Sequence, residues 1–375
     1  MTLSAPELNR ATLARQSLLE RRAETVPEAV RRVVALQAQE PASPYLALWN
    51  RIAAFDPADL DAAYADGTIV RSSLLRLTLH AVHGDDHPDF HHAMLPSLRA
   101  SRLNDRRFTD TGLTAEQLDE LLPDLRAYLT EPRTKGDIET FLEERLGQHE
   151  PRAWWALRMY APLHHAPTGG PWAFENRGAF VAAPDLEPPP HEETVRRLML
   201  RYLEGFGPAT LRDLAQFTLL RMGVLKDAAA ALTDELVTFD GPDGQTLLDV
   251  PDGPRPDGDT PAPARLLPMW DSILLAYADR SRVIPPDLRP EVIRRNGDVL
   301  PTVLVDGYVA GVWRPSDSGI EVTALHPIDD DTWHQLDAEA QTLTAFLADR
   351  EPTVYRRYAR WWEALDATDI RILPS

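Results

Sequence analysis

The chain contains no cysteine among its 375 residues, and lysine is nearly absent, with only Lys135 and Lys226 among 39 basic residues. The lack of cysteine excludes disulfides, cysteine-ligated metal or iron–sulfur sites and thiol nucleophiles. No uninterrupted apolar run reaches the roughly 18 residues that a membrane span needs. The N-terminus also lacks the basic patch and apolar stretch of a secretory signal. We therefore expect a soluble, cytoplasmic protein.

What is present suggests a large globular protein with an acidic surface. Hydrophobic residues make up 43% of the chain, enough for a sizeable core, and the length is typical of two or three domains. The formal net charge is −19, from 58 acidic and 39 basic residues. Because a phosphate backbone repels an acidic protein, the total charge by itself argues against a nucleic-acid partner.

The acidic residues are unevenly distributed, however. Residues 227–259 hold nine acids and one arginine, a net charge of −8, while residues 110–124 and 329–339 each hold five acids and no base. These three stretches carry −18 of the −19. If they lie on the outer rim, the rest of the chain is nearly neutral, and its arginines can form a local positive channel.

Three passes along the chain repeat one order of predicted elements, a set of helices followed by a β-hairpin. Capping signals such as Ser4 with Glu7 and Thr114 with Gln117 mark helix starts. The predicted helices are 4–19, a helix opened by Pro27, 56–66, a helix from 114, 134–146, 153–160, 192–204, 211–218 and 225–232, and the predicted strands are 68–73, 75–83, 164–166, 178–183, 235–239 and 246–250. This order is typical of a winged helix.

A different pattern follows the linker at 252–263, which is rich in Pro, Gly and Asp. Strands are predicted at 265–268, 299–306, 308–314 and 319–325, and two closing helices at 336–349 and 353–365. Asp306-Gly307 is a strong hairpin signal. We predict a mainly α fold with β structure (α+β): winged-helix units at 1–110, 111–190 and 191–252, then a β-rich region with helices at 264–375.

The most informative local feature is Gln37-Ala38-Gln39, just before Pro41. Pro41 disfavours helix at the residue before it, so the second predicted helix must end near here. In extended backbone, residues two apart share a face, so the two amides can project side by side and offer paired donors and acceptors without charge. A polar loop that follows a helix is the alternative interpretation.

Histidines suggest a metal site only weakly. His80, His83, His87, His91 and His92 lie close together, and His87 and His91 have i, i+4 spacing. No H-E-x-x-H motif is present, and a zinc site needs a third ligand with a supporting partner. We therefore predict no metal, and we interpret these histidines as surface or capping residues. The sequence evidence for a two-carboxylate hydrolase is equally unspecific, because a chain with 58 acidic residues contains carboxylate pairs by chance.

A second unusual segment follows the linker. It combines Trp270 and Asp271 with Arg280 and Arg282. One interpretation is a strand that enters a barrel and carries an Asp–Arg surface pair. The other is the edge of a site where the two arginines meet phosphates.

Together these segments resemble the winged-helix DNA glycosylases that unhook interstrand crosslinks, the AlkZ family. The likeness spans about residues 8–362. It is carried by the segments 36–39 (LQAQ), 70–80 (VRSSLLRLTLH), 207–214 (GPATLRDL) and 267–271 (LPMWD) with 279–282 (DRSR). The family signature is Gln-Φ-Gln or a relative with Asp or His in place of one Gln, and here the apolar middle residue is Ala38.

The resemblance implies three tandem winged helices around a concave DNA channel, with a β-hairpin that reaches into the DNA, for which residues 313–319 are our candidate. It implies a monofunctional enzyme without a cofactor that hydrolyses the N-glycosidic bond of N7-alkylated purines, crosslinks included, in DNA repair or in self-resistance of the azinomycin type. Gln37 and Gln39 would be catalytic. We expect the following further site residues: Arg71, Arg76, Arg280, Arg282 and Arg314 at DNA, and His80, Trp270 and Asp271 at the site edge.

The implied partner is double-stranded DNA with alkylated or crosslinked purines, met in the cytoplasm at the nucleoid by a monomer without an obligate protein partner. Two alternatives remain. One is a non-catalytic winged-helix transcription regulator, although residues 216–222 offer only Gln216 and Arg221 for base edges. The other is an acidic binding module with no nucleic-acid role.

Overall fold

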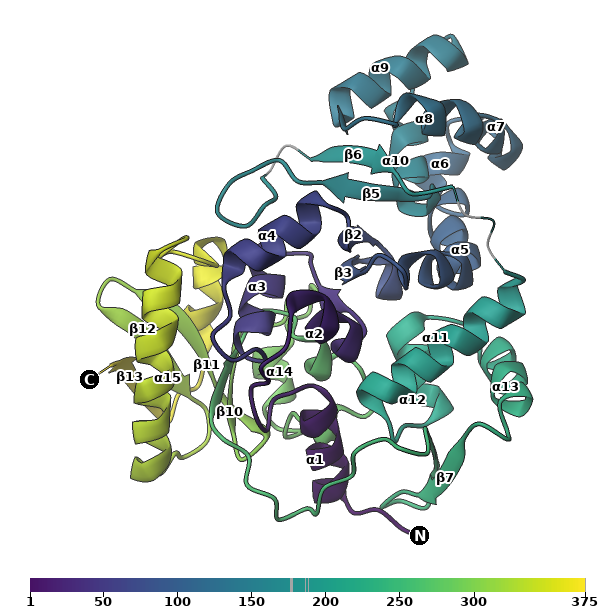
Figure 1. The fold of residues 1–375 in the computed structure, drawn as a ribbon. Helices are drawn as coiled ribbons and strands as arrows, with labels where there is room; N and C mark the ends of the chain where they lie inside the picture. Colours follow the sequence, from purple (N-terminus) through teal and green to yellow (C-terminus); the bar gives the residue numbers. More distant parts are fainter. Residues whose placement is uncertain (176–177, 186, 188, 375) are drawn as a thin grey trace.

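The computed structural model describes residues 1–175, 178–185, 187 and 189–374. It is 45% helix and 17% strand, which confirms the predicted mainly α fold with β structure. Among the described residues, no helix is both long and apolar enough to cross a membrane. Figure 1 shows the C-terminal strands on the left of the molecule and most helices from the middle of the chain on the right.

The first unit is built around short, well-capped helices. Its elements are α1 (Ala5–Arg15), α2 (Val26–Val33), β1 (Leu36–Gln37), α3 (Ala42–Trp49), α4 (Pro57–Ala65), β2 (Ile69–Ser73), the 3₁₀ turn η1 (Leu75–Leu77) and β3 (Leu79–His83). Ser4 and Thr25 form capping boxes with Glu7 and Glu28, which satisfies backbone N–H groups at the helix starts. Helix α3 was not predicted. Its prolines stand at the N-cap and in the first turn, where a helix tolerates them.

The next group of elements, which we call the second unit, contains α5 (His87–Leu103), α6 (Arg106–Thr109), α7 (Ala115–Glu120), α8 (Leu122–Tyr128), β4 (Arg133–Thr134), α9 (Lys135–Leu146), α10 (Pro151–Tyr160), β5 (Leu163–Ala166) and β6 (Ala179–Ala182). Helices α5 and α6 fall within the predicted first unit, 1–110, but they are grouped here because both pack against α10. Helix α5 was missed because Pro88, Pro96 and several histidines obscure its pattern. The hairpins of the first two units join in one sheet of order β1-β3-β2-β5-β6-β4, through the pair Arg71–His165.

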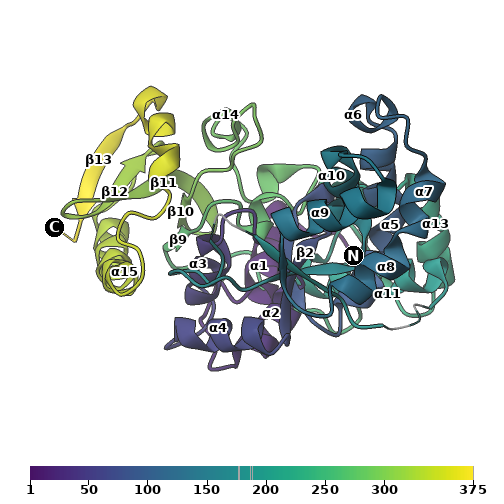
Figure 2. The ribbon, with the colours of Figure 1, turned by 90° about the horizontal axis from the view of Figure 1, so that it is seen from above.

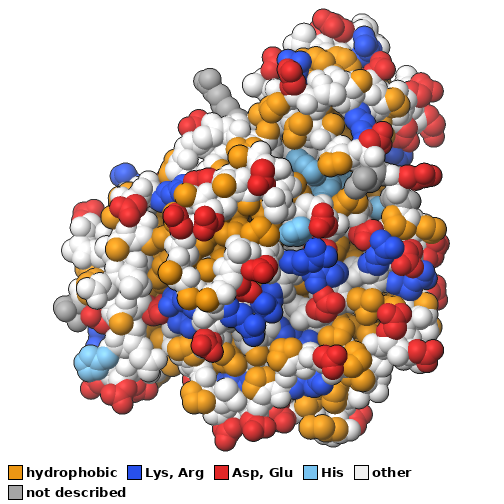
Figure 3. Space-filling model, viewed as in Figure 1, with side chains coloured by type: hydrophobic (Ala, Val, Ile, Leu, Met, Phe, Trp, Pro, Cys, Tyr) orange, Lys and Arg blue, Asp and Glu red, His pale blue; other side chains and the backbone are white. Residues whose placement is uncertain are grey.

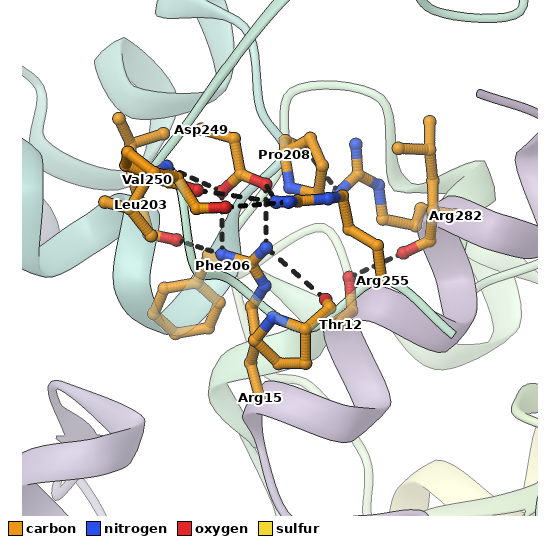
Figure 4. A network of polar contacts seen from close by, with 12 residues as sticks. Thr12, Arg15, Leu203, Phe206, Pro208, Asp249, Val250, Arg255 and Arg282 are labelled. Atoms are coloured by element: carbon orange, nitrogen blue, oxygen red, sulfur yellow. Dashed lines mark hydrogen bonds and ion pairs between the residues drawn. The ribbon is translucent and has the colours of Figure 1, made fainter. Parts of the chain in front are cut away.

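The third unit contains α11 (His191–Phe206), α12 (Leu211–Thr218), α13 (Met222–Ala231), β7 (Val237–Asp240) and β8 (Thr246–Asp249). A buried ion pair ties it to the first helix. Both carboxylate oxygens of Asp249 accept hydrogen bonds from Arg15, each at 2.8 Å, and Arg255 joins them from the linker. Arg15 also donates to the Leu203 carbonyl (Figure 4). The buried carboxylate of Asp249 is therefore compensated inside the protein by two arginines.

The C-terminal region forms a five-stranded antiparallel sheet of order β13-β12-β11-β10-β9. Its elements are β9 (Arg265–Leu267), η2 (Ser272–Leu274), η3 (Arg280–Arg282), α14 (Arg289–Val292), β10 (Thr302–Val305), β11 (Tyr308–Ser316), β12 (Gly319–Ala324), α15 (Asp330–Ala348), η4 (Arg356–Ala364) and β13 (Asp369–Leu373). The four predicted strands and the first closing helix are present. The second predicted helix is the 3₁₀ segment η4, and β13 was not predicted.

The hydrophobic core crosses the predicted unit boundaries. One cluster joins the first unit to the C-terminal sheet, with Leu46, Leu266 and Trp313 among its members. The other joins the second and third units through residues such as Trp154 and Phe206. Figure 2 shows the C-terminal sheet at one end, the second unit at the other, and α1 to α4 between them. The first unit thus lies where both cores meet.

The acidic stretches do not lie entirely on the outer surface of the protein, although the sequence suggested that arrangement. Asp249 of the stretch 227–259 is fully buried against Arg15. Glu339 of the stretch 329–339 is paired with Arg21 and Arg265. Figure 3 shows Lys and Arg side chains across the middle of one face, over α2 and α11, and many acidic side chains toward its margins. Part of the negative charge is therefore used inside the fold to neutralise arginines.

Candidate active site

The strand β1 holds Gln37 in extended backbone, as predicted. It pairs with β3 in the register Leu36–Ala81 and Gln37–His80, and the Ala38 N–H donates to the Leu79 carbonyl at 2.8 Å. The preceding helix ends earlier than Pro41 required, at Val33. There the chain reverses at Val34, whose φ of 71° belongs to the left-handed region that a β-branched residue rarely adopts.

The Gln37 side chain is almost fully enclosed, with 5% exposure. Its carbonyl oxygen accepts a hydrogen bond of 2.8 Å from Arg76 Nη2. Its amide nitrogen donates to Thr78 Oγ1 at 3.1 Å. The amide is therefore held from both ends by residues of the η1–β3 turn.

Gln39 is the exposed member of the pair. Its carbonyl oxygen accepts a long hydrogen bond of 3.5 Å from the Leu79 backbone N–H. Because Gln37 contacts Thr78 and Gln39 contacts Leu79, the two amides lie beside the start of the same strand. The sequence pattern predicted this juxtaposition, but it could not show that one amide is fixed and the other is open to solvent.

The turn before β3 departs from the predicted strand at 75–83. Residues Leu75–Leu77 form a 3₁₀ turn in which Arg76 and Leu77 have φ values of 51° and 59°. Two successive left-handed residues that are not glycine are costly. Their effect is to point the Arg76 side chain back at β1.

Gln39 lines a cleft of about 800 Å³. Its walls come from the first and second units and from the C-terminal segment, and they combine cationic, aromatic and acidic side chains: Arg71, Lys135, Arg158, Arg357, Trp154, Trp172, Phe174, Phe180, His165, Glu40, Glu175 and Glu351. Arg158 is exposed and has no ion pair with any described residue. Such a lining suits a nucleic acid, since cations meet phosphates and aromatic rings meet bases.

Glu40 closes this cleft on one side. Its carboxylate accepts hydrogen bonds from Arg357 and from the Tyr358 hydroxyl, both of the segment η4. Burial raises the pKa of Glu40 despite the neighbouring Arg357 charge. The Gln37–Gln39 segment and the C-terminal segment are therefore joined one residue beyond Gln39.

Two of the arginines that the sequence placed at DNA make hydrogen bonds to the Gln37–Gln39 segment; Arg71 is buried at the wall of the cleft and Arg76 is partly exposed. Arg71 is 7% exposed and donates two hydrogen bonds, of 3.0 and 2.8 Å, to the Ala38 carbonyl. Burial lowers its pKa to about 10. Arg76 is bonded to Gln37 and packs over the Phe217 ring. In this structure both guanidinium groups hold the Gln37–Gln39 segment, because it offers them buried acceptors.

The other three predicted DNA arginines lie farther along the chain. Arg280, in η3, is half-buried and has no ion pair with any described residue. Arg282 donates to the Pro208 carbonyl and stacks over Tyr277. Arg314 is paired with Glu321 within the β11–β12 hairpin. This is the hairpin predicted at 313–319; Trp313 is buried at its base, and its turn is exposed.

The predicted site-edge residues are all buried. Asp271 forms a two-point ion pair with Arg51, and both side chains are fully enclosed. Trp270 donates to the Gly297 carbonyl. These two residues therefore support the core, and of the three only His80 touches the Gln37 network, through a contact of 3.0 Å with Arg76. No three His, Asp or Glu side chains of the described residues are arranged to hold a metal ion.

We compared the chain with known protein families, curated proteins and solved structures. Residues 30–346 match the family described as DNA glycosylase AlkZ-like. The chain belongs to the AlkZ-like DNA glycosylases. A curated AlkZ-like relative, the interstrand DNA cross-link repair glycosylase of Streptomyces sahachiroi, is 25% identical over 331 residues, which are 83% of this chain and 88% of that protein.

The fold is shared as well. The solved structure of the Streptomyces sahachiroi DNA glycosylase AlkZ superimposes with a TM-score of 0.79 at 23% identity, over 94% of this chain and 99% of that chain. Family membership makes this AlkZ-like chain a DNA N-glycosylase.

Several residues of the cleft were not predicted from the sequence. Glu40 adjoins the Gln pair in sequence, and its position before Pro41 gave no hint of burial. Arg357, Trp172 and Phe174 come from distant segments, so only the tertiary structure brings them to the cleft. Arg158 could have been found as one of two exposed arginines, with Arg152, on the otherwise apolar helix α10.

Proposed function

We propose that this AlkZ-like glycosylase hydrolyses the N-glycosidic bond of N7-alkylated purines in duplex DNA, including purines tied to the opposite strand by a crosslink. Alkylation at N7 puts a positive charge on the base and makes it a good leaving group. The sugar then passes through an oxocarbenium-like state, as in glycoside hydrolysis. Little general-acid help is needed, so the enzyme acts by holding a water and stabilising charge.

Gln37 and Gln39 are proposed to carry this role. The observation that supports it best is the pairing of a fixed, buried amide with an exposed amide at the mouth of a cleft lined by cations and aromatic rings. An amide oxygen is a weak base but can accept a hydrogen bond from a water and orient it toward C1′. Neutral amides also leave the developing positive charge without a covalent partner, as a monofunctional enzyme requires.

The cleft is open to solvent, so it can accept a purine that is still bonded to the opposite strand. A crosslinked purine cannot be swung freely into an enclosed pocket, because its adduct is bonded to the other strand. Arg158 and Lys135 on the wall of the second unit, with Arg280 in η3, are the cations that we propose for the phosphates. The β11–β12 hairpin remains our candidate for the element that enters the DNA.

The test uses a duplex with a single N7-methylguanine. The enzyme in excess should release free N7-methylguanine and leave an abasic site without cutting the strand. Gln37→Ala and Gln39→Ala should each slow release by about 100-fold, as loss of one preorganised polar group does elsewhere. Gln341→Ala, at an exposed glutamine of α15, is the matched control and should behave as the wild type.

A second arm uses a duplex crosslinked through two N7 positions, and a denaturing gel then reports separation of the strands. The wild type should unhook it, and the two active-site variants should not. Tight duplex binding without base release would contradict the proposal and favour the transcription-regulator alternative. Release at wild-type rates by both glutamine variants would refute the assigned roles.

A further inference from the structure

The contacts of Arg76 determine which neighbouring atoms around Gln37 donate hydrogen bonds and which accept them. Arg76 Nη2 lies 2.8 Å from the Gln37 carboxamide oxygen and 3.0 Å from His80 Nε2. A guanidinium group donates hydrogen bonds and cannot accept them, so both partners must be acceptors. His80 consequently carries its proton on Nδ1, which donates to the Thr78 carbonyl at 3.1 Å. Burial and the nearby Arg76 charge lower the pKa of His80, in keeping with this neutral tautomer.

The same logic continues on the other side of the amide. Gln37 Nε2 donates to Thr78 Oγ1 at 3.1 Å, and this hydroxyl donates to the Leu75 carbonyl at 3.1 Å. If the amide were flipped, its NH₂ group would face a guanidinium that only donates. Thr78 Oγ1 also lies 3.4 Å from the Gln37 carbonyl oxygen. One amide N–H of Gln37 remains for a water or substrate.

The position of Arg76 beside Gln37 is energetically unfavourable in two respects, backbone strain and a charge for which the described residues offer no counter-ion. Its φ of 51° and that of Leu77, 59°, are left-handed. Among the described residues Arg76 has no carboxylate partner, and its Nη1 atom is buried without a hydrogen bond. Burial and the nearby Arg280 charge lower its pKa to about 9. Strain and uncompensated charge of this kind concentrate at functional sites.

We propose that Arg76 is a positioning residue, which orients the Gln37 amide for the reaction through the hydrogen bond to its carbonyl oxygen. The proposal rests on the glycosylase function proposed above. It replaces the phosphate contact that the sequence suggested for Arg76. The guanidinium lies over the Phe217 ring of α12, with 5.0 Å to the ring centroid, so its position is fixed by the third unit and its hydrogen bonds by the first.

Single-turnover kinetics on the N7-methylguanine duplex test this role. Arg76→Gln, which can accept a hydrogen bond and so permits the flipped amide, should slow base release by about 10- to 100-fold. Its Kd for the duplex should stay within about twofold of the wild type, since a group that acts only on the reaction leaves binding unchanged. Arg76→Lys keeps the charge and the donors on a single nitrogen, and it should retain more of the rate.

The double variant Gln37→Ala/Arg76→Gln decides between roles. If Arg76 acts through Gln37, the double variant is no slower than Gln37→Ala alone. Arg212→Gln, at an exposed arginine of α12, controls for loss of a positive charge and should keep the wild-type rate. Thermal unfolding of each variant confirms that it is folded, and Arg76→Lys carries the test if Arg76→Gln is not.

Three results would overturn the proposal. The first is a wild-type rate in Arg76→Gln, or in Arg76→Lys where that variant carries the test. The second is an additive loss in the double variant. The third is a weaker Kd with a shallower salt dependence, which would mean that Arg76 contacts phosphate. Each differs from failure of the proposed function, in which the wild type releases no base or Gln37→Ala keeps the full rate.

Discussion

The ion pair between Arg51 and Asp271 gives the sharpest prediction for stability. Arg51 donates to the two carboxylate oxygens of Asp271, each at 2.8 Å, and both side chains have 0% exposure. One of these oxygens also accepts from the Ile273 N–H at 3.2 Å. In Asp271→Asn, an NH₂ group replaces one acceptor and Arg51 is left as a buried charge without a counter-ion. Breaking a buried pair in this way costs about 3–5 kcal/mol.

This loss is a large part of the roughly 5–15 kcal/mol by which a folded domain is stable. The thermal midpoint of Asp271→Asn should fall by roughly 6–20 °C, at about 2–4 °C per kcal/mol. Asp243→Asn, at an exposed turn residue, is the control and should leave the midpoint unchanged. The double variant Arg51→Met/Asp271→Leu should recover most of the loss, because it removes both charges.

The same variant also separates structure from catalysis. Below its midpoint, Asp271→Asn should release base at the wild-type rate per folded molecule. An unchanged midpoint, or a rate loss without a change in stability, would refute the reasoning and return Asp271 to the site edge that the sequence suggested.

Two further predictions concern the surroundings of the Gln pair. Gly205→Ala places a methyl group 2.5 Å from Val34 Cγ2 and should destabilise the protein by about 1–3 kcal/mol in urea unfolding, whereas Gly223→Ala, with open space around it, should not. Glu40→Gln should raise the thermal midpoint at pH 8 and leave it nearly unchanged at low pH. The reason is that the raised pKa of Glu40 makes ionisation oppose folding: the penalty grows once the pH passes the ordinary pKa of a glutamate and is complete above the raised pKa, while the exposed Arg357 loses little. A lower midpoint for Glu40→Gln at pH 8 would show instead that the pair with Arg357 outweighs the burial.

Local signals in the sequence predicted much of the fold. Ser4 and Thr114 cap helices as expected, because a capping box depends only on residues three apart. Asp306-Gly307 forms the predicted hairpin between β10 and β11. Caps and tight turns could therefore be predicted from sequence, because they depend only on residues that are close together in the chain.

Non-local contacts account for what the sequence did not predict. The pairing of β2 with β5 joins segments about ninety residues apart, and no local pattern encodes it. The left-handed turn at Arg76 is held by its tertiary partners, since its own residues favour a strand. Arg71 was expected at DNA from the family resemblance, but the Ala38 carbonyl gives it a buried partner. For the same reason, the Gln37–Ala38–Gln39 motif could be located from sequence while its supporting residues could not.

The central claim is that the Gln37–Gln39 site hydrolyses the glycosidic bond of a crosslinked, N7-alkylated purine. The most direct measurement is mass spectrometry of the products after a single turnover on a crosslinked duplex. We predict separated and uncut strands, with an abasic site on one strand and the complete adduct on the other, and no such products with Gln37→Ala/Gln39→Ala. Intact crosslinks in the presence of bound wild-type enzyme, or the same products from the double variant, would contradict it.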